Sequence, residues 1–238
     1  MTPSVPDPEL VDRLVLANRI LYAQGVVDGF GHVSVRHDRS PEHFLLARNM
    51  APALVRREDI LVFDRAGDPL DAHGRRVYLE RFIHGEIYRV RADVHSIVHS
   101  HSPSVIPFGV TGRTLRPVFH MSGFLGEGAA SFEIRDVAGD TDMLVSNGTL
   151  GAALARTLGE RSTVLMRGHG STVVGSSLEQ AVYRAVYAEV NARLQLQAMA
   201  LGTVTYLNAQ EAAKSAAAND TQLARAWDLW ARSVGPVE

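Results

Sequence analysis

The strongest regularity in the sequence is a row of apolar residues spaced four apart between Ser177 and Leu201. The row consists of Leu178, Val182, Val186, Val190 and Leu194. Residues at this spacing lie on one face of an α-helix, because a helix completes a turn every 3.6 residues. Ser177 can cap this helix, and Gln180 occupies the position that a capping box requires. Such a long helix excludes a nearly all-β fold such as a cupin.

Short segments with the periodicity of β-strands alternate along the chain with helical segments. In His32–His37, Val33 and Val35 face one way while Ser34 and Arg36 face the other, as in a half-buried strand. Apolar composition predicts further strands at Phe44–Ala47, Ile60–Phe63, Val94–His99, Met143–Ser146 and Thr163–Met166. Further helices are predicted at Glu9–Gln24, Glu80–Val90, Asn147–Gly159 and Asn219–Ser233. We expect one mixed α/β domain over residues 1–238, with residues 203–238 as a helical C-terminal extension.

Composition excludes several classes of protein. The 24 Lys+Arg and 26 Asp+Glu form no run of one sign, so the chain has no electrostatic footprint for nucleic acid or anionic lipid. The absence of cysteine excludes a disulfide framework, a thiolate metal site and a cysteine nucleophile. No apolar stretch approaches the roughly 20 residues that span a bilayer, and Met1–Glu9 lacks the layout of a signal peptide. We therefore expect a cytoplasmic protein that binds neither nucleic acid nor membrane.

Histidines that can hold a metal ion lie in two separate parts of the sequence. His99 and His101 are two residues apart, so their imidazoles project from the same face of an extended segment. His169 lies between Gly168 and Gly170, which allow a sharp turn of the backbone. Three imidazoles without a thiolate suit one divalent ion such as Mn, Zn, Fe or Co, with other positions open to water or substrate. An H-x-H pair also occurs in loops by chance, and spacing does not bring His169 to the other two.

Glu80 and His84 lie four residues apart on one face of a predicted helix, just before the histidine strand. One interpretation is a carboxylate beside the metal, acting as a ligand or as a general acid or base. The other is an exposed acid–imidazole pair that adds a few tenths of a kcal/mol to the helix. The spacing by itself leaves both interpretations open.

Taken together, these motifs resemble the signature of the class II aldolase/adducin family. The resemblance rests on Glu80–Asp93, His99–Pro103, Gly168–Gly170 and Gly31–Arg36, in which His32 occupies the family's asparagine position. It runs from about Glu9 to Gly202. It implies a class II aldolase-like α/β/α sandwich around a mostly antiparallel central sheet.

The resemblance also implies a metal site and an assembly. It implies one divalent metal ion per subunit, bound by His99, His101 and His169, with Glu80 as the neighbouring proton-transfer group. It further implies a homo-oligomer, a tetramer or higher, with the site close to a subunit boundary.

The chain departs from the family members that cleave sugar phosphates. Those members hold the phosphate with small residues, including a serine pair just before the glutamate. Here Tyr78 and Leu79 precede Glu80. These bulky side chains cannot supply hydroxyl donors to a phosphate in the same space. Where the family has an earlier phosphate-binding segment, Arg48 offers a planar fork for a carboxylate and Asn49 adds an amide. A phosphosugar aldolase is therefore disfavoured.

The segment Pro117–Phe124 adds aromatic and sulfur surface that suits a flat ring better than a polyol. Within it, Phe119 is a candidate substrate-binding residue, with plain core packing as the alternative. His120 is a candidate second catalytic acid, with a place in the pocket wall as the alternative.

These features resemble a smaller branch of the family, which decarboxylates aromatic ortho-hydroxy dicarboxylates. That resemblance implies a metal-dependent lyase acting on a small aromatic carboxylate. 3,4-Dihydroxyphthalate is the first candidate and gives protocatechuate and carbon dioxide; 3-hydroxy-2-methylpyridine-4,5-dicarboxylate is the second. Glu80, kept neutral by a raised pKa, is expected to protonate the ring. The alternatives are a retro-aldol lyase on an unphosphorylated substrate and a non-catalytic adducin-like interaction module.

Overall fold

One seven-stranded sheet, with strand order β3-β2-β1-β4-β7-β6-β5, forms the centre of the fold. The computed structural model describes residues 4–237. Its strands are β1 (His32–Arg36), β2 (His43–Ala47), β3 (Ile60–Asp64), β4 (Ser96–Ser100), β5 (Ala130–Phe132), β6 (Thr163–Met166) and β7 (Gly170–Gly175). All neighbouring strands pair antiparallel except β5 and β6, which are parallel. The mostly antiparallel sheet confirms the predicted fold class.

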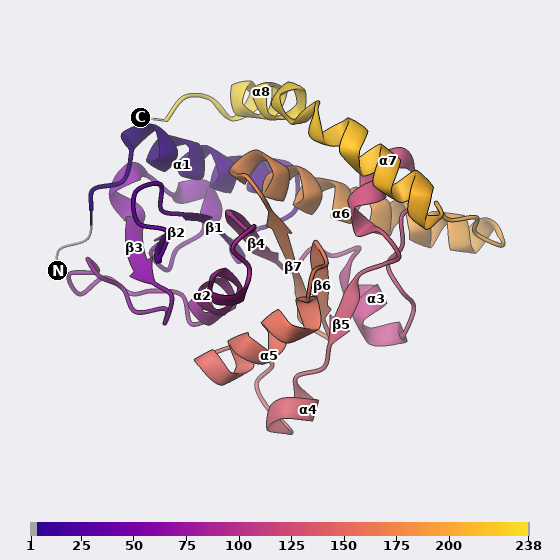
Figure 1. The fold of residues 1–238 in the computed structure, drawn as a ribbon, viewed down its shortest axis with the longest axis horizontal. Helices are drawn as coiled ribbons and strands as arrows, with labels where there is room; N and C mark the ends of the chain where they lie inside the picture. The colour runs from indigo at the N-terminus through magenta and orange to yellow at the C-terminus, as the bar shows by residue number, and fades with distance from the viewer. Residues whose placement is uncertain (1–3, 238) are drawn as a thin grey trace.

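Helices cover both faces of this sheet (Figure 1). On one side lie α1 (Pro8–Ala23), α6 (Leu178–Leu201) and α8 (Leu223–Val234), and on the other α2 (Arg81–Val90) and α5 (Gly148–Leu158). The remaining helical elements are α3 (Ile106–Thr111), α4 (Arg135–Ala138), α7 (Ala209–Asp220), η1 (Pro52–Leu54), η2 (Arg57–Asp59) and η3 (His120–Leu125). The layers form the predicted α/β/α sandwich. No helix within residues 4–237 is long and apolar enough to cross a membrane.

The alternating side chains of the strands pack into apolar clusters on both faces of the sheet. Val33 and Val35 of β1 pack into the core beneath α1 and α6. Phe44 and Leu46 of β2 pack into the core beneath α2 and α5. The opposite face of β1 carries Ser34, which is fully buried and hydrogen-bonds side chains of α2. The sequence predicts that the polar face of β1 is exposed to solvent. In the structure this face is buried.

Two predicted elements differ from the structure, and strands β5 and β7 were not predicted. Residues 143–146 form a loop and no strand, because backbone groups of this segment bond side chains of the candidate site. Gly170–Gly175, which follows the predicted glycine turn, is the strand β7. The predicted helix Asn219–Ser233 begins at Leu223, since α7 ends at Asp220. Helix α7 itself was detectable from its capping box, in which Asn208 and Glu211 bond each other's backbone amides.

Candidate metal centre

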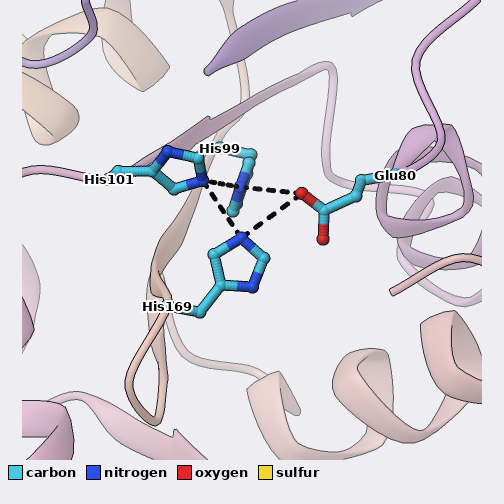
Figure 2. Close-up of side chains that lie close together, drawn as sticks. All are labelled: Glu80, His99, His101 and His169. Atoms are coloured by element: carbon cyan, nitrogen blue, oxygen red, sulfur yellow. Dashed lines mark hydrogen bonds and ion pairs between the residues drawn. The ribbon is translucent and has the colours of Figure 1, made fainter. Parts of the chain in front are cut away.

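Four side chains from distant parts of the sequence converge at one end of the central strands (Figure 2). His99 lies on β4 and His101 just beyond its end. His169 lies in the turn between β6 and β7, and β7 pairs with β4, which places this turn beside the two histidines. Glu80 is the N-cap residue that directly precedes α2. The predicted meeting of His169 with the H-x-H pair is thus produced by strand pairing.

The ring nitrogens and one carboxylate oxygen face a common centre (Figure 2). Nε2 of His101 lies 3.3 Å from Nε2 of His99 and 3.0 Å from Nε2 of His169. Oε2 of Glu80 lies 3.4 Å from Nε2 of His99 and 3.3 Å from Nε2 of His169. A tetrahedral zinc ion with Zn–N distances of about 2.0–2.1 Å holds its ligand atoms about 3.3–3.4 Å apart. The four donors therefore fit a single divalent ion.

The loop formed by residues 143–146 orients two of these side chains through hydrogen bonds on the side away from the common centre. Nδ1 of His169 donates to the carbonyl of Met143 at 2.9 Å, which leaves its Nε2 free to act as a ligand. Oε1 of Glu80 accepts a hydrogen bond from the amide of Val145 at 2.9 Å, so its Oε2 faces the histidines. Met143 has a left-handed backbone with φ of 72°, a conformation that a strand cannot contain.

Electrostatics set the protonation of the cluster. Burial raises the pKa of Glu80, but His99 and His169 outweigh burial, and the pKa of this carboxyl falls well below its usual range. The raised pKa expected from an apolar pocket is therefore wrong, because that expectation ignored the neighbouring imidazoles. Burial and the charges of His99 and His169 lower the pKa of His101 to about 4. At neutral pH, Glu80 is ionised and His101 is a neutral imidazole.

A cavity of about 310 Å³ opens in front of the cluster. Its lining comprises Gly29, Phe30, Gly31, His32, Asn49, Met50, Ala51, Tyr78, Leu79, Glu80, His99, His101 and Leu144. This lining contains no lysine or arginine, and its walls away from the cluster are mostly apolar. The hydroxyl of Tyr78 donates to the carbonyl of Met50, and burial raises the pKa of Tyr78 to about 12. The only proton of that hydroxyl is therefore donated within the protein and is not available to a ligand.

The two candidate substrate-binding residues of the segment before η1 lie differently. Asn49 lines the cavity beside the cluster. Arg48 pairs with Asp59 at 2.6 Å and lines a separate cavity with Arg56 and Glu58. The structure does not bring Arg48 to the metal cluster, so its part in substrate binding stays a prediction.

The aromatic segment also lies away from the cluster of the same chain. The ring of Phe119 lies 6.3 Å from the ring of Tyr187 on α6. The carbonyl of His120 accepts a hydrogen bond from Nδ2 of Asn219 at the end of α7. Neither residue lines the cavity, and their catalytic and binding roles stay predictions.

His84 is not part of an exposed acid–imidazole pair, because its exposed fraction is 0%. Its Nε2 lies 2.7 Å from Nδ1 of His32, and His32 lines the cavity. Sequence reasoning missed this pair. The available signal was that His32 and Ser34 share the face of β1 opposite Val33 and Val35.

Comparisons with known proteins find similarities over most of the chain. Residues 12–196 match the family model described as Class II Aldolase and Adducin N-terminal domain. The chain is 36% identical to the decarboxylase tropJ of Talaromyces stipitatus, with 90% of each chain covered. It is 33% identical to a 3,4-dihydroxyphthalate decarboxylase of Arthrobacter keyseri, with 80% of this chain and 79% of that protein covered.

Solved structures share the fold. An aldolase II superfamily protein from Pseudomonas syringae superposes with a TM-score of 0.77 at 21% identity, covering 98% of this chain and 94% of that one. An L-fuculose 1-phosphate aldolase from Glaciozyma antarctica superposes with a TM-score of 0.72 at 26% identity, covering 90% of this chain and 85% of that one. The chain is thus similar in sequence to relatives named as decarboxylases and similar in fold to solved structures named as aldolases.

Proposed function

The chain belongs to the class II aldolase and adducin family, and we propose that it is a metal-dependent decarboxylase of an aromatic ortho-hydroxy dicarboxylate. The observation that carries this proposal is the cluster of Glu80, His99, His101 and His169 at the wall of a mostly apolar cavity. The decarboxylase relatives at 33% and 36% identity support the choice of reaction. The first substrate candidate is 3,4-dihydroxyphthalate, and 3-hydroxy-2-methylpyridine-4,5-dicarboxylate is the second.

The cavity is poorly suited to a sugar phosphate. A phosphate ester carries close to two negative charges, and enzymes hold it with Lys, Arg, hydroxyls or backbone amides. The cavity lining contains no Lys or Arg. Tyr78 donates its hydroxyl to Met50, and Leu79 has no donor in its side chain. A flat ring, in contrast, contacts the apolar side chains of Phe30, Met50 and Leu79 favourably.

A divalent ion held by His99, His101 and His169 would supply Lewis-acid stabilisation of the negative charge on the ring oxygen beside the carboxylate. We assign the proton transfers of the reaction to Glu80. Glu80 is ionised at neutral pH, so its carboxylate can accept the proton of the ortho-hydroxyl. The resulting phenolate makes the ring carbon that bears the carboxylate basic.

Glu80 then delivers this proton to the carbon that bears the carboxylate, and the ring becomes a dienone. The bond from that carbon to the carboxylate breaks, carbon dioxide leaves, and the bonding electrons restore the aromatic phenolate. Solvent reprotonates the phenolate on release. Glu80 ends in the ionised form in which it began, so the proton count balances.

Asn49 is a polar residue of the cavity lining that lies outside the metal cluster, and it can orient the ring. Its amide can donate to the second carboxylate and thereby decide which carboxylate lies at the metal. A cavity of about 310 Å³ accommodates a single substituted ring.

We also propose a homotetramer or a higher homo-oligomer, in the cytoplasm as the sequence leads us to expect. Phe30 supports an assembly, because it lines the cavity and is 69% exposed. A neighbouring subunit that covers Phe30 would close the cavity mouth and exclude water. Light scattering on the purified chain measures the mass of the assembly.

The substrate assay compares both aromatic dicarboxylates with L-fuculose 1-phosphate. We expect carbon dioxide release from an aromatic dicarboxylate and no aldehyde from the sugar phosphate. Aldehyde release without any release of carbon dioxide would contradict the proposed function.

A further inference from the structure

A chain of four buried polar side chains runs inward from the cavity wall. Nδ1 of His32 lies 2.7 Å from Nε2 of His84, and Nδ1 of His84 lies 2.6 Å from Oγ of Ser34. Oγ of Ser34 lies 2.8 Å from the hydroxyl of Tyr88. His32 and Ser34 come from β1, and His84 and Tyr88 lie one turn apart on α2. All four side chains are buried, and none belongs to the metal cluster.

The direction of each hydrogen bond in this series follows from Tyr88, which lies at its inner end. A buried phenol must donate its proton, because an unpaired buried hydroxyl is costly. Tyr88 has two acceptors within reach, Oγ of Ser34 at 2.8 Å and the carbonyl of His95 at 3.4 Å. The shorter bond is the better one, since hydroxyl donors prefer about 2.7–2.8 Å. Tyr88 therefore donates to Ser34.

The remaining bonds are fixed once Tyr88 donates to Ser34. The hydroxyl of Ser34 must then donate to Nδ1 of His84. His84 is neutral, since burial and His99 lower its pKa to about 3, so its single proton lies on Nε2. That proton is donated to Nδ1 of His32. A neutral His32 that accepts at Nδ1 carries its own proton on Nε2.

Nε2 of His32 opens toward the cavity. His32 lines the cavity, and its other ring nitrogen is occupied by His84. Among the described residues, Nε2 of His32 has no hydrogen-bond partner, yet it is absent from the fully buried polar atoms that lack one. This nitrogen is therefore reached from the cavity, next to the ring of His99, whose centroid lies 5.0 Å from that of His32.

We propose that His32 binds an oxygen of the substrate through its Nε2–H, and that Tyr88, Ser34 and His84 are positioning residues that hold this tautomer. The inference rests on the proposed function in one respect, the identity of the substrate as an aromatic carboxylate. A fixed neutral donor suits this cavity because no Lys or Arg lines it to hold a carboxylate or phenolate oxygen. Its place beside His99 puts the bound oxygen close to the metal ligands.

The tautomer can be measured without any substitution. We would record ring ¹⁵N and ¹H NMR signals of zinc-loaded protein labelled with ¹⁵N-histidine, assigning His32 with the variant His32→Gln. The proposal requires the ring proton of His32 on Nε2, and the proton of His84 on Nε2 as well. A His32 proton on Nδ1 would overturn it. In Tyr88→Phe, which removes the first donor, we expect a mixture of both His32 tautomers; an unchanged tautomer would remove Tyr88 from the proposal.

Binding of the product protocatechuate, measured by calorimetry on zinc-loaded protein, tests the donor itself. His32→Phe keeps a ring but loses Nε2–H, and His32→Gln keeps a donor at the same reach. We expect binding to weaken about 10- to 100-fold in His32→Phe, as for a hydrogen bond to a charged group, and to recover largely in His32→Gln. Equal binding by both variants and the original protein, or loss of zinc in His32→Phe, would contradict the proposal.

Activity of the unchanged protein separates the two proposals. If it releases carbon dioxide from 3,4-dihydroxyphthalate while His32→Phe keeps full kcat/KM, the inference about His32 fails and the proposed function stands. If the unchanged protein releases none from any aromatic dicarboxylate, the proposed function fails. The NMR measurement then still decides whether His32 presents a donor to the cavity.

Discussion

Nε2 of His169 lies 3.3 Å from Oε2 of Glu80, and the same loop holds both side chains from behind. The carbonyl of Met143 accepts from His169, and the amide of Val145 donates to Glu80. The loop thus fixes the β6–β7 turn relative to the N-cap residue of α2. Outer-shell partners of this kind orient metal ligands, so this loop helps to set the geometry of the cluster.

Replacement of His99 by alanine is expected to abolish both metal binding and turnover. His99 is fully buried at the centre of the cluster, and its removal leaves one of the four donors missing. His95→Ala is the matched control, since His95 precedes β4 and is exposed. Metal content by atomic emission and carbon dioxide release should both fall in His99→Ala and stay unchanged in His95→Ala. Retention of both by His99→Ala would show that the metal assignment is wrong.

Glu80→Gln tests proton transfer. The amide oxygen of glutamine can still accept from Val145, so the fold is expected to persist, but the side chain can no longer take up and return a proton. We expect kcat to fall by about 10²–10⁴-fold, the usual contribution of general acid–base catalysis. Glu86→Gln, on the same helix and paired with Arg89, should leave kcat unchanged. A Glu80→Gln enzyme with normal kcat would assign Glu80 a purely structural part.

Buried His84 predicts a loss of stability in acid. Its folded pKa is about 3, below the ordinary value of 6.5, so the unfolded chain binds more protons between these two values. The free energy of unfolding therefore falls as the pH drops below 6.5, by up to about 1.4 kcal/mol per pH unit for this site. We would measure the free energy of unfolding of metal-free protein in urea at pH 7 and at pH 5.5. The difference between the two pH values should be smaller in His84→Gln than in the unchanged protein. An equal difference in both proteins would contradict the buried, neutral His84.

Gly170→Ala is expected to disturb the metal site through the backbone. A Cβ at Gly170 would lie 2.1 Å from the carbonyl oxygen of Ser100, so β7 and β4 would have to separate beside His101 and His169. We expect destabilisation of about 1–3 kcal/mol and weaker zinc binding in a competition with a chelator. At Gly109, where the nearest atom would lie 3.5 Å away, alanine should change neither quantity. Normal zinc binding by Gly170→Ala would mean that the strands adapt freely.

Much of the fold follows from local periodicity. Helix α6 and strand β1 show clear spacing in the sequence, strand β6 is predicted from its apolar composition, and all three form where they are predicted. Residues 143–146 are apolar enough for a strand, but their backbone bonds to Glu80 and His169 outweigh that preference. Such bonds involve residues far apart in the sequence, and local periodicity carries no information about them.

The candidate metal ligands could be located from the sequence, whereas their surroundings could not. An H-x-H pair and a glycine-flanked histidine are visible in the sequence, and the β4–β7 pairing brings them together. The lowered pKa of Glu80 depends on distances to His99 and His169 that only the fold defines. The contact between His32 and His84 likewise depends on how α2 lies across β1.

Metal-dependent release of carbon dioxide tests the central claim most directly. The protein is stripped with a chelator, reloaded singly with Mn, Co, Zn or Fe, and assayed with 3,4-dihydroxyphthalate and with the pyridine dicarboxylate. We predict no release by the stripped protein and recovery with at least one ion, at one equivalent per chain. Equal release by stripped and reloaded protein, or no release from either substrate with metal bound, would contradict a metal-dependent aromatic decarboxylase.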